Sequence, residues 1–181
     1  MSIWEIVAIG LGLSMDAAAV TLCDAMGYRD MPPAMRASLP VAFGLFQGVM
    51  PLLGYFLGSL FSDFISRYAG ITTLVILAFI GANMIKGAFE QKCDSSQKFT
   101  FLTLLLQSIA TSIDAFAVGV SFYAMGANIA FAAPIIALTT FCCSLVALAF
   151  GKRLGESFGQ KAQIAGGVVL ILIGIKSALG I

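Results

Sequence analysis

Six long apolar segments follow one another along the chain, and short segments between them hold most of the charged residues. A helix needs about 20 consecutive apolar residues to cross a bilayer, and each segment approaches or exceeds that length. We therefore predict an all-α integral membrane protein with six transmembrane helices. The predicted helices occupy residues 3–23, 37–60, 70–89, 101–123, 130–150 and 164–181.

The overall composition agrees with a chain that is surrounded by lipid. The sequence is 60% hydrophobic and 10% charged, with a mean hydropathy of +1.00, whereas soluble domains are close to half apolar. No basic residue precedes the first apolar segment, so we expect this helix to be retained and not cleaved as a signal peptide. A net charge of +1 predicts no nucleic-acid partner.

Lysine and arginine are distributed unevenly about the predicted helices. Eight of the ten basic residues lie in or beside the first, third and fifth connections, and only Arg67 and Lys176 belong to the other side. Because cytoplasmic loops are enriched in basic residues, both termini are predicted to lie outside the cytoplasm. The eight residues are Arg29, Arg36, Lys86, Lys92, Lys98, Lys152, Arg153 and Lys161.

The two halves of the chain are related in sequence. Residues 14–20 (S-M-D-A-A-A-V) recur 98 residues later as residues 112–118 (S-I-D-A-F-A-V). Each half holds three predicted helices, an odd number, so the second half must enter the membrane from the opposite face. We predict two inverted three-helix repeats, residues 1–89 and 101–181, joined by a cytoplasmic linker at 90–100, in a single membrane domain.

The repeated motif carries an aspartate in each half. Asp16 and Asp114 both lie about 13 residues, or ~20 Å of helix rise, from one end of their predicted helices, and so fall near mid-membrane. An aspartate at that depth costs about 2.5–3.5 kcal/mol on insertion scales, which makes a functional role the first hypothesis. The alternative is a protonated carboxyl group that only hydrogen-bonds a neighbouring helix.

Further polar residues share the depth of the two aspartates. Gln47 precedes Pro51 by four residues, so its main-chain carbonyl loses a helical partner and joins the side-chain oxygen as a candidate ligand. A proline kink satisfied by another helix is the alternative. On the fourth segment, spacings of three and four place Gln107, Thr111, Asp114 and Ser121 on one inward face.

Asp24 lies about two helical turns nearer the cytoplasm than Asp16. It could line an entry vestibule together with Gln107. Its place at the end of a predicted helix favours the other interpretation, a charge solvated by water.

Carboxylates, hydroxyl groups and amide oxygens, in a chain without histidine, are the ligands of a hard divalent cation. Two aspartates and one such ion sum to zero charge, as a site in low dielectric requires. When the ion leaves, the two carboxylates would repel each other and take up protons, so we hypothesise exchange of metal for protons. No cofactor is expected beside the transported ion. The candidate metal ligands are Asp16, Asp114, Gln47, Thr111, Ser112 and Ser14.

The four cysteines show no C-x-x-C spacing. We expect all of them to be small, buried apolar residues. They are Cys23, Cys93, Cys142 and Cys143.

These motifs resemble the bacterial manganese efflux pumps, the MntP family. The resemblance rests on the S-x-D-A-x-A-V element in both halves, on residues 43–54 (F-G-L-F-Q-G-V-M-P-L-L-G) and on residues 110–115 (A-T-S-I-D-A). It covers essentially the whole chain, and it implies a plasma (inner) membrane exporter that removes Mn²⁺ from the cytoplasm, with Asp16 and Asp114 important for transport. Asp24 departs from the small or neutral residue expected there.

Three alternatives stay open at this point. The cargo could be another divalent ion such as Cd²⁺, or an amino acid, since amino-acid exporters share a similar six-helix plan. An intramembrane aspartyl protease also uses two aspartates, but the Gly-x-Gly-Asp element of those enzymes is missing before Asp16 and Asp114. An oligomer is compatible with the sequence.

Overall fold

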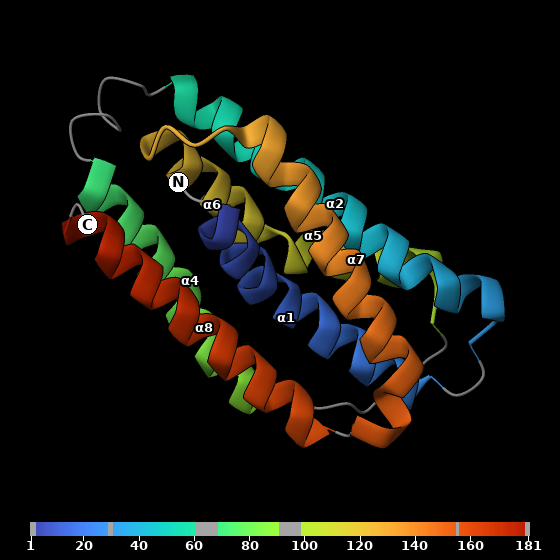
Figure 1. The fold of residues 1–181 in the computed structure, drawn as a ribbon. Helices are drawn as coiled ribbons and strands as arrows, with labels where there is room; N and C mark the ends of the chain where they lie inside the picture. Colours follow the sequence, from blue (N-terminus) through green and yellow to red (C-terminus); the bar gives the residue numbers. More distant parts are fainter. Residues whose placement is uncertain (1–2, 29–30, 61–68, 91–98, 155, 180–181) are drawn as a thin grey trace.

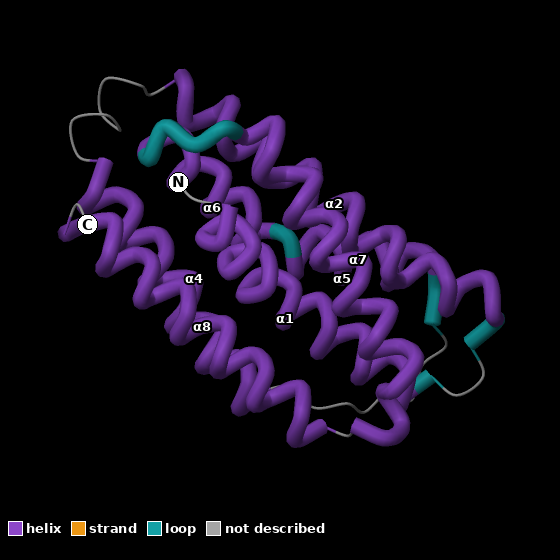
Figure 2. The backbone as a smooth tube through the Cα atoms, in the orientation of Figure 1, coloured by secondary structure: helices purple, strands orange, loops and turns teal. Residues whose placement is uncertain are grey.

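The computed structural model describes residues 3–28, 31–60, 69–90, 99–154 and 156–179. Within these ranges all regular structure is α-helical, and the helices form an elongated bundle (Figures 1 and 2). The helices are α1 (Ile3–Gly27), α2 (Pro33–Leu60), α4 (Ala69–Glu90), α5 (Phe101–Thr111), α6 (Ile113–Ala124), α7 (Ile129–Leu154) and α8 (Glu156–Leu179).

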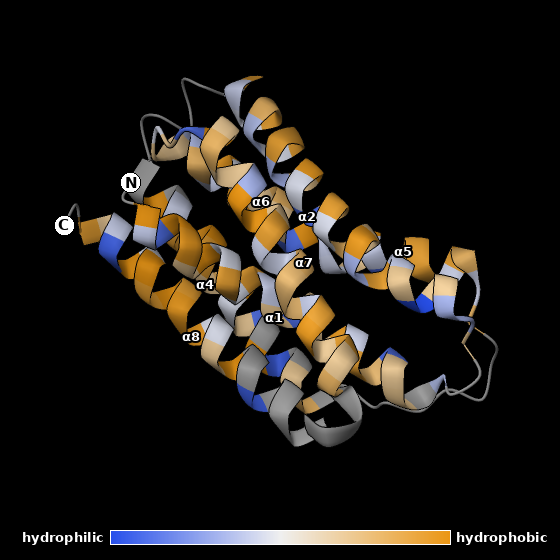
Figure 3. Cartoon of the chain, turned by 45° about the vertical axis from the view of Figure 1, so that its right-hand side comes forward, coloured by the Kyte–Doolittle hydropathy of each residue, from blue (hydrophilic) through white to orange (hydrophobic). Residues whose placement is uncertain are grey.

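The bundle has the dimensions and surface of a membrane protein. Four described stretches are long and apolar enough to cross a bilayer, namely Ile3–Met26, Pro33–Leu60, Phe101–Ala124 and Ile129–Phe150. Two shorter apolar stretches, Thr73–Asn83 and Ile164–Leu179, lie in α4 and α8. Large apolar side chains such as Leu45, Phe56 and Leu138 point outward, and hydrophobic residues cover much of the bundle (Figure 3). Such a surface is stable in lipid and not in water.

The start of the first helix and the end of the last helix lie at the same end of the bundle. α1 begins and α8 ends at one end of the bundle, whereas α2 and α5 begin at the other end (Figure 1). Lys176 of α8 donates a hydrogen bond of 2.5 Å to the Glu5 carboxylate of α1, and this ion pair joins the two helices at the first end.

The most extensive helix contacts join the N-terminal part of the chain to the C-terminal part. α1 packs on α7 and α8, α2 packs on α6 and α7, and α4 packs on α8. The side chains of Ile9, Leu13 and Ala17 on α1 have no exposed surface. α1 therefore runs through the interior of the bundle.

Glycines let several of these helices touch along their backbones. A Cβ atom at Gly54 of α2 would overlap the carbonyl oxygen of Phe116, and one at Gly119 of α6 would overlap that of Pro51. Gly81 of α4 and Gly167 of α8 face each other in the same way. Membrane helices lack a hydrophobic driving force for association, so this close approach is a main source of their attraction.

The fourth predicted helix, residues 101–123, is interrupted, which corrects the expectation of one continuous helix. Ser112, with φ −104° and ψ 1°, separates α5 from α6. The Thr111 and Ser112 hydroxyl groups donate to the carbonyl oxygens of Gln107 and Ser108 at 2.9 and 2.5 Å. Such bonds compete with the helical pattern and bend helices.

The cysteines differ from their expected role. Cys142 is exposed, Cys143 is partly exposed, and Cys23 is disulfide-bonded. The prediction of buried, small apolar residues is therefore wrong for these three, and Cys93 lies outside the described residues.

Candidate cation site

The two aspartates of the repeated motif lie close together in the bundle. Asp16 is in the middle of α1 and Asp114 is in the first turn of α6. Their carboxyl groups are near enough to interact electrostatically. The Asp114 Oδ2 atom is buried and, within the described part of the chain, has no hydrogen-bond partner. A pair of acidic groups with an unpaired, buried oxygen is a place where a cation would be held.

The helix interruption explains how Asp114 is positioned. The Ala115 N–H would bond the Thr111 carbonyl in a continuous helix, but it donates to Asp114 Oδ1 at 2.8 Å. The carboxyl group therefore caps the start of α6, where the positive end of the helix dipole favours an anionic oxygen. The bond fixes Oδ1 and leaves Oδ2 available.

Gln47 fills the gap that this rearrangement leaves. Its side chain is fully buried, and its Nε2 atom donates to the freed Thr111 carbonyl at 2.9 Å. Its Oε1 atom has no hydrogen-bond partner in the part of the chain that the structure describes. Two buried acceptor oxygens, Asp114 Oδ2 and Gln47 Oε1, thus lie on helices that pack against each other.

The hydroxyl groups of the other candidate ligands are tied to their own helices. Ser14 donates to the Leu11 carbonyl at 2.8 Å, and Thr111 and Ser112 make the bonds described above. Ser14 and Ser112 are fully buried. Each proton points away along the helix, and the oxygen lone pairs remain able to face a cation.

Two further buried hydroxyl groups, both on α7, were not predicted. Thr140 and Ser144 on α7 have no exposed surface, and no described residue forms a hydrogen bond with their hydroxyl oxygens. Ser144 lies 97 residues after Gln47, the same spacing that relates Gly54 to Gly151. This correspondence was a signal in the sequence that could have pointed to Ser144. α7 packs on α1, the helix that carries Asp16. Ser144 is therefore a buried oxygen on a helix that neighbours the aspartate pair.

Asp24 is buried, which overturns the interpretation of a solvated charge. It is 3% exposed, and its Oδ1 atom accepts a hydrogen bond of 3.1 Å from Gln107 Nε2. The predicted helix ended at residue 23, whereas α1 continues to Gly27. Asp24 therefore lies within the helix and meets α5 instead of solvent.

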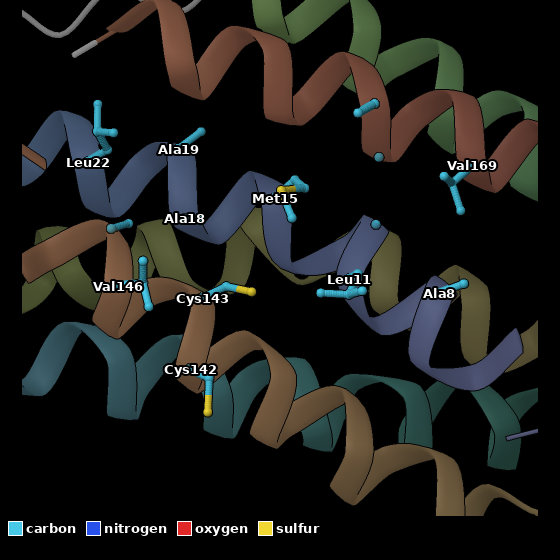
Figure 4. A pocket seen from close by; sticks show the side chains of 14 residues that line it. Ala8, Leu11, Met15, Ala18, Ala19, Leu22, Cys142, Cys143, Val146 and Val169 are labelled. Atoms are coloured by element: carbon cyan, nitrogen blue, oxygen red, sulfur yellow. The ribbon is translucent and has the colours of Figure 1, made fainter. Parts of the chain in front are cut away.

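A cavity of about 560 Å³ between α1, α7 and α8 is separate from the aspartate pair (Figure 4). Its lining is apolar apart from thiol and thioether groups, and includes Met15, Cys143, Val146 and Val169. Neither Asp16 nor Asp114 lines it. Among the described residues, no three His, Cys, Asp or Glu side chains gather in one place. A cation at the aspartate pair would need amide, hydroxyl or water oxygens to complete its shell.

Apolar helices that enclose carboxyl, amide and hydroxyl oxygens define a helical membrane protein with a polar centre. This chain belongs to the family described as "Putative manganese efflux pump", whose profile matches residues 30–177.

Relatives match along almost the whole chain. A protein named "Putative manganese efflux pump MntP" from Ruminiclostridium cellulolyticum is 38% identical over 97% of this chain and 95% of its own length. A relative from Wolinella succinogenes, named as MntP 1, is 44% identical over 97% of this chain and 96% of its own length. A third, from Actinobacillus succinogenes, is 40% identical over 97% and 95%. No solved structure matches the chain.

Proposed function

We propose that this chain exports Mn²⁺ from the cytoplasm and binds the ion between Asp16 and Asp114. Its relatives, which match this chain over nearly their full length, carry the name "Putative manganese efflux pump MntP". The observation that carries the proposal for the site is the proximity of two carboxyl groups in the bundle, one of which has a buried oxygen without a partner. The role is transport and not catalysis.

The oxygens at this depth suit Mn²⁺, a hard cation that prefers carboxylate, carbonyl and water ligands. The two carboxylates neutralise its charge, and Gln47 Oε1 is a further acceptor without a partner. Ser14, Thr111 and Ser112 contribute hydroxyl oxygens from the two repeated motifs, and Ser144 adds one from α7. A neutral cluster avoids the cost of an isolated ion in low dielectric.

Proton antiport follows from the same chemistry. When the ion leaves, two carboxylates close together in an apolar interior repel each other and lose their compensating charge. Protons that bind from the far side of the membrane remove this repulsion and return the pair to a neutral state. The pair thus holds either a metal ion or protons, and each displaces the other.

We further propose that the protein has six transmembrane helices in two inverted repeats, residues 1–89 and 101–181, with 90–100 as a linker. The helix contacts support this because they are symmetric. If each helix is replaced by the corresponding helix of the other repeat, each of the main contacts maps onto a contact that is also present. Exchange turns the α1–α7 contact into the α6–α2 contact, turns α1–α8 into α6–α4, and leaves α2–α7 and α4–α8 unchanged, and all six contacts are present. The site then lies between the halves, as in many secondary transporters.

The proposed location is the plasma (inner) membrane, with both termini outside the cytoplasm. The basis is the distribution of basic residues. With this orientation the Glu5–Lys176 ion pair is at the outer end, and the Asp24–Gln107 pair lies on the cytoplasmic side of the central aspartates.

The test is the manganese content of an exporter-deficient bacterium after Mn²⁺ challenge. Wild type, Asp16→Asn and Asp114→Asn are expressed at verified equal levels. Glu5→Gln is the matched control, because it removes a carboxylate from α1 at the end of the bundle. We expect wild type and Glu5→Gln to lower cell manganese, and both central variants to leave it at the level of cells without exporter.

Two other outcomes would contradict different parts of the proposal, one the binding site and the other the transported ion. If the central variants lower manganese as well as wild type does, the aspartate pair is not the transport site. If wild type leaves manganese unchanged but lowers the content of another cation such as Cd²⁺, the proposed cargo is wrong.

A further inference from the structure

Asp24 and Gln107 form a polar pair whose hydrogen bonds, among the described residues, are incomplete. Gln107 Nε2 donates to Asp24 Oδ1 at 3.1 Å. Asp24 Oδ2 and Gln107 Oε1 are both buried and have no hydrogen-bond partner among the described residues. Asp24 is 3% exposed, so bulk solvent scarcely reaches its carboxyl group. Two buried acceptor atoms without a hydrogen bond, on neighbouring side chains, carry a free-energy penalty.

A single proton between Asp24 Oδ2 and Gln107 Oε1 would give both atoms a hydrogen bond. A carboxyl group that is protonated on Oδ2 is a donor, and the amide oxygen of Gln107 is the acceptor that completes the pair. The carboxyl and amide groups would then exchange two hydrogen bonds, N–H to Oδ1 and O–H to Oε1. We propose that Asp24 and Gln107 form a proton-binding site, distinct from the central aspartate pair.

The surroundings favour a proton over a metal ion. The described charged side chains on the helices that pack against α1 are few. Arg36 on α2 donates to the Tyr28 carbonyl at 3.4 Å, Lys161 on α8 is exposed, and Lys176 pairs with Glu5 at the other end of α1. α5 and the described side chains of α7 carry no charge. One carboxyl and one amide oxygen are too few protein ligands for a divalent cation.

The position of this pair connects it to the central site. Asp24 follows Asp16 by eight residues, or about 12 Å of helix rise. Gln107 lies one turn before Thr111, whose hydroxyl donates to the Gln107 carbonyl and whose own carbonyl accepts from Gln47. The proton site is therefore linked to the central site through α5.

Its role in transport rests on the proposed antiport. When Mn²⁺ arrives from the cytoplasm, a central carboxyl group must lose its proton. Asp24 first releases its own proton to the cytoplasm. The O–H bond at the central aspartate then breaks as an O–H bond forms again at Asp24 Oδ2, so Asp24 relays the proton toward the cytoplasm.

Infrared spectroscopy of the purified full-length protein in lipid tests the site without any transport measurement. We expect the wild-type protein to show the carbonyl stretch of a protonated carboxyl group that disappears at high pH. The band should be lost in Asp24→Asn and retained in Glu5→Gln and Asp114→Asn. Asp24→Asn should fold, because an asparagine amide presents the same donor and acceptor to Gln107 as the protonated acid.

Gln107→Leu gives an independent readout. It keeps the carboxyl group but removes its acceptor, so the Asp24 band should shift in frequency. A spectrum in which neither Asp24→Asn nor Gln107→Leu changes a carboxyl band would overturn the proposal. The result does not depend on cargo, so a wild-type protein that moves no manganese would refute the proposed function and leave this test intact.

In proteoliposomes that do move Mn²⁺, Asp24→Asn should still transport the ion but lose most of the stimulation by a pH gradient. Unchanged stimulation would mean that Asp24 does not relay the coupling proton.

Discussion

The Gln47 amide on α2 bonds the Thr111 carbonyl on α5 at 2.9 Å, so a residue of the N-terminal part of the chain completes the broken helix of the C-terminal part. That carbonyl is free because the Ala115 N–H donates to the Asp114 side chain instead. The two bonds depend on each other. The helix interruption positions Asp114, and Gln47 stabilises the interruption in an apolar environment because it bonds the carbonyl left free.

Replacing Gln47 should therefore weaken both stability and transport. Gln47→Leu leaves the Thr111 carbonyl unpaired, which costs about 1 kcal/mol or more, and removes a candidate ligand oxygen. We expect a lower melting temperature in detergent and reduced Mn²⁺ efflux. Thr21→Val is the control, since the Thr21 hydroxyl bonds only Ala17 of its own helix at 2.7 Å. Equal melting temperatures for Gln47→Leu and wild type would contradict the bridging role.

Glycine contacts between α2 and α6 should tolerate no side chain. In Gly54→Ala and Gly119→Ala the new methyl group overlaps backbone, so the helices must separate, at a cost of about 1–3 kcal/mol. Gly10→Ala is the matched control, because its Cβ would meet Thr139 Oγ1 at 3.4 Å, an ordinary contact. Thermal unfolding should rank Gly10→Ala near wild type and the other two well below it. The reverse order would show that α2 and α6 do not touch at these residues.

The unpaired hydroxyl of Ser144 should matter for transport more than for stability. Ser144→Ala removes a buried oxygen without a partner, so folding loses no hydrogen bond. If this oxygen helps to bind the ion, the concentration of Mn²⁺ needed for half-maximal transport should rise severalfold at an unchanged melting temperature. The comparison is Ser108→Ala, whose hydroxyl is bonded to the Leu104 carbonyl at 2.8 Å. Identical kinetics for Ser144→Ala and wild type would remove Ser144 from the site.

The proposed exchange of metal for protons fixes the sign of the pH dependence. Protons enter as Mn²⁺ leaves, so a lower pH outside than inside should accelerate efflux. In inside-out vesicles, an acidic interior should drive Mn²⁺ uptake, and uptake should release protons from the vesicles. A metal flux that is independent of the gradient and moves no protons would rule out antiport.

The orientation can be checked with reporters fused after Ile181. Alkaline phosphatase at this position should be active, and green fluorescent protein should be dark, because the C-terminus is predicted to lie outside the cytoplasm. The same reporters placed in the linker at 90–100 should give the opposite result. A fluorescent C-terminal fusion would invert the proposed topology.

The sequence predicted the helices well, because each predicted apolar segment coincides with a described helix or helix pair. The length of an apolar segment is a local property and needs no knowledge of neighbours. The interruption at Ser112 was missed because it depends on a competition between side-chain and main-chain acceptors. The consecutive hydroxyl residues Thr111 and Ser112 were the only local sign of it.

Contacts between segments far apart in the sequence could be predicted only where the similarity of the two repeats singled out the residues involved. The similarity of the two motifs singled out Asp16 and Asp114, and the structure brings these residues together. No pattern in the sequence linked Asp24 to a specific hydrogen bond with Gln107, which follows from how α5 packs against the end of α1. The buried state of Asp24 was predicted wrongly for the same reason.

The helix contacts also constrain how the protein is made. α1, α2 and α4 find their principal partners among α6, α7 and α8 and have little contact with one another. When the ribosome has delivered only the first half to the membrane, those helices have no stable neighbours and must remain apart in lipid. Assembly therefore waits for synthesis of the last helix, and a chain that stops early leaves the polar face of α1, with Asp16 and Asp24, open to membrane quality-control proteases.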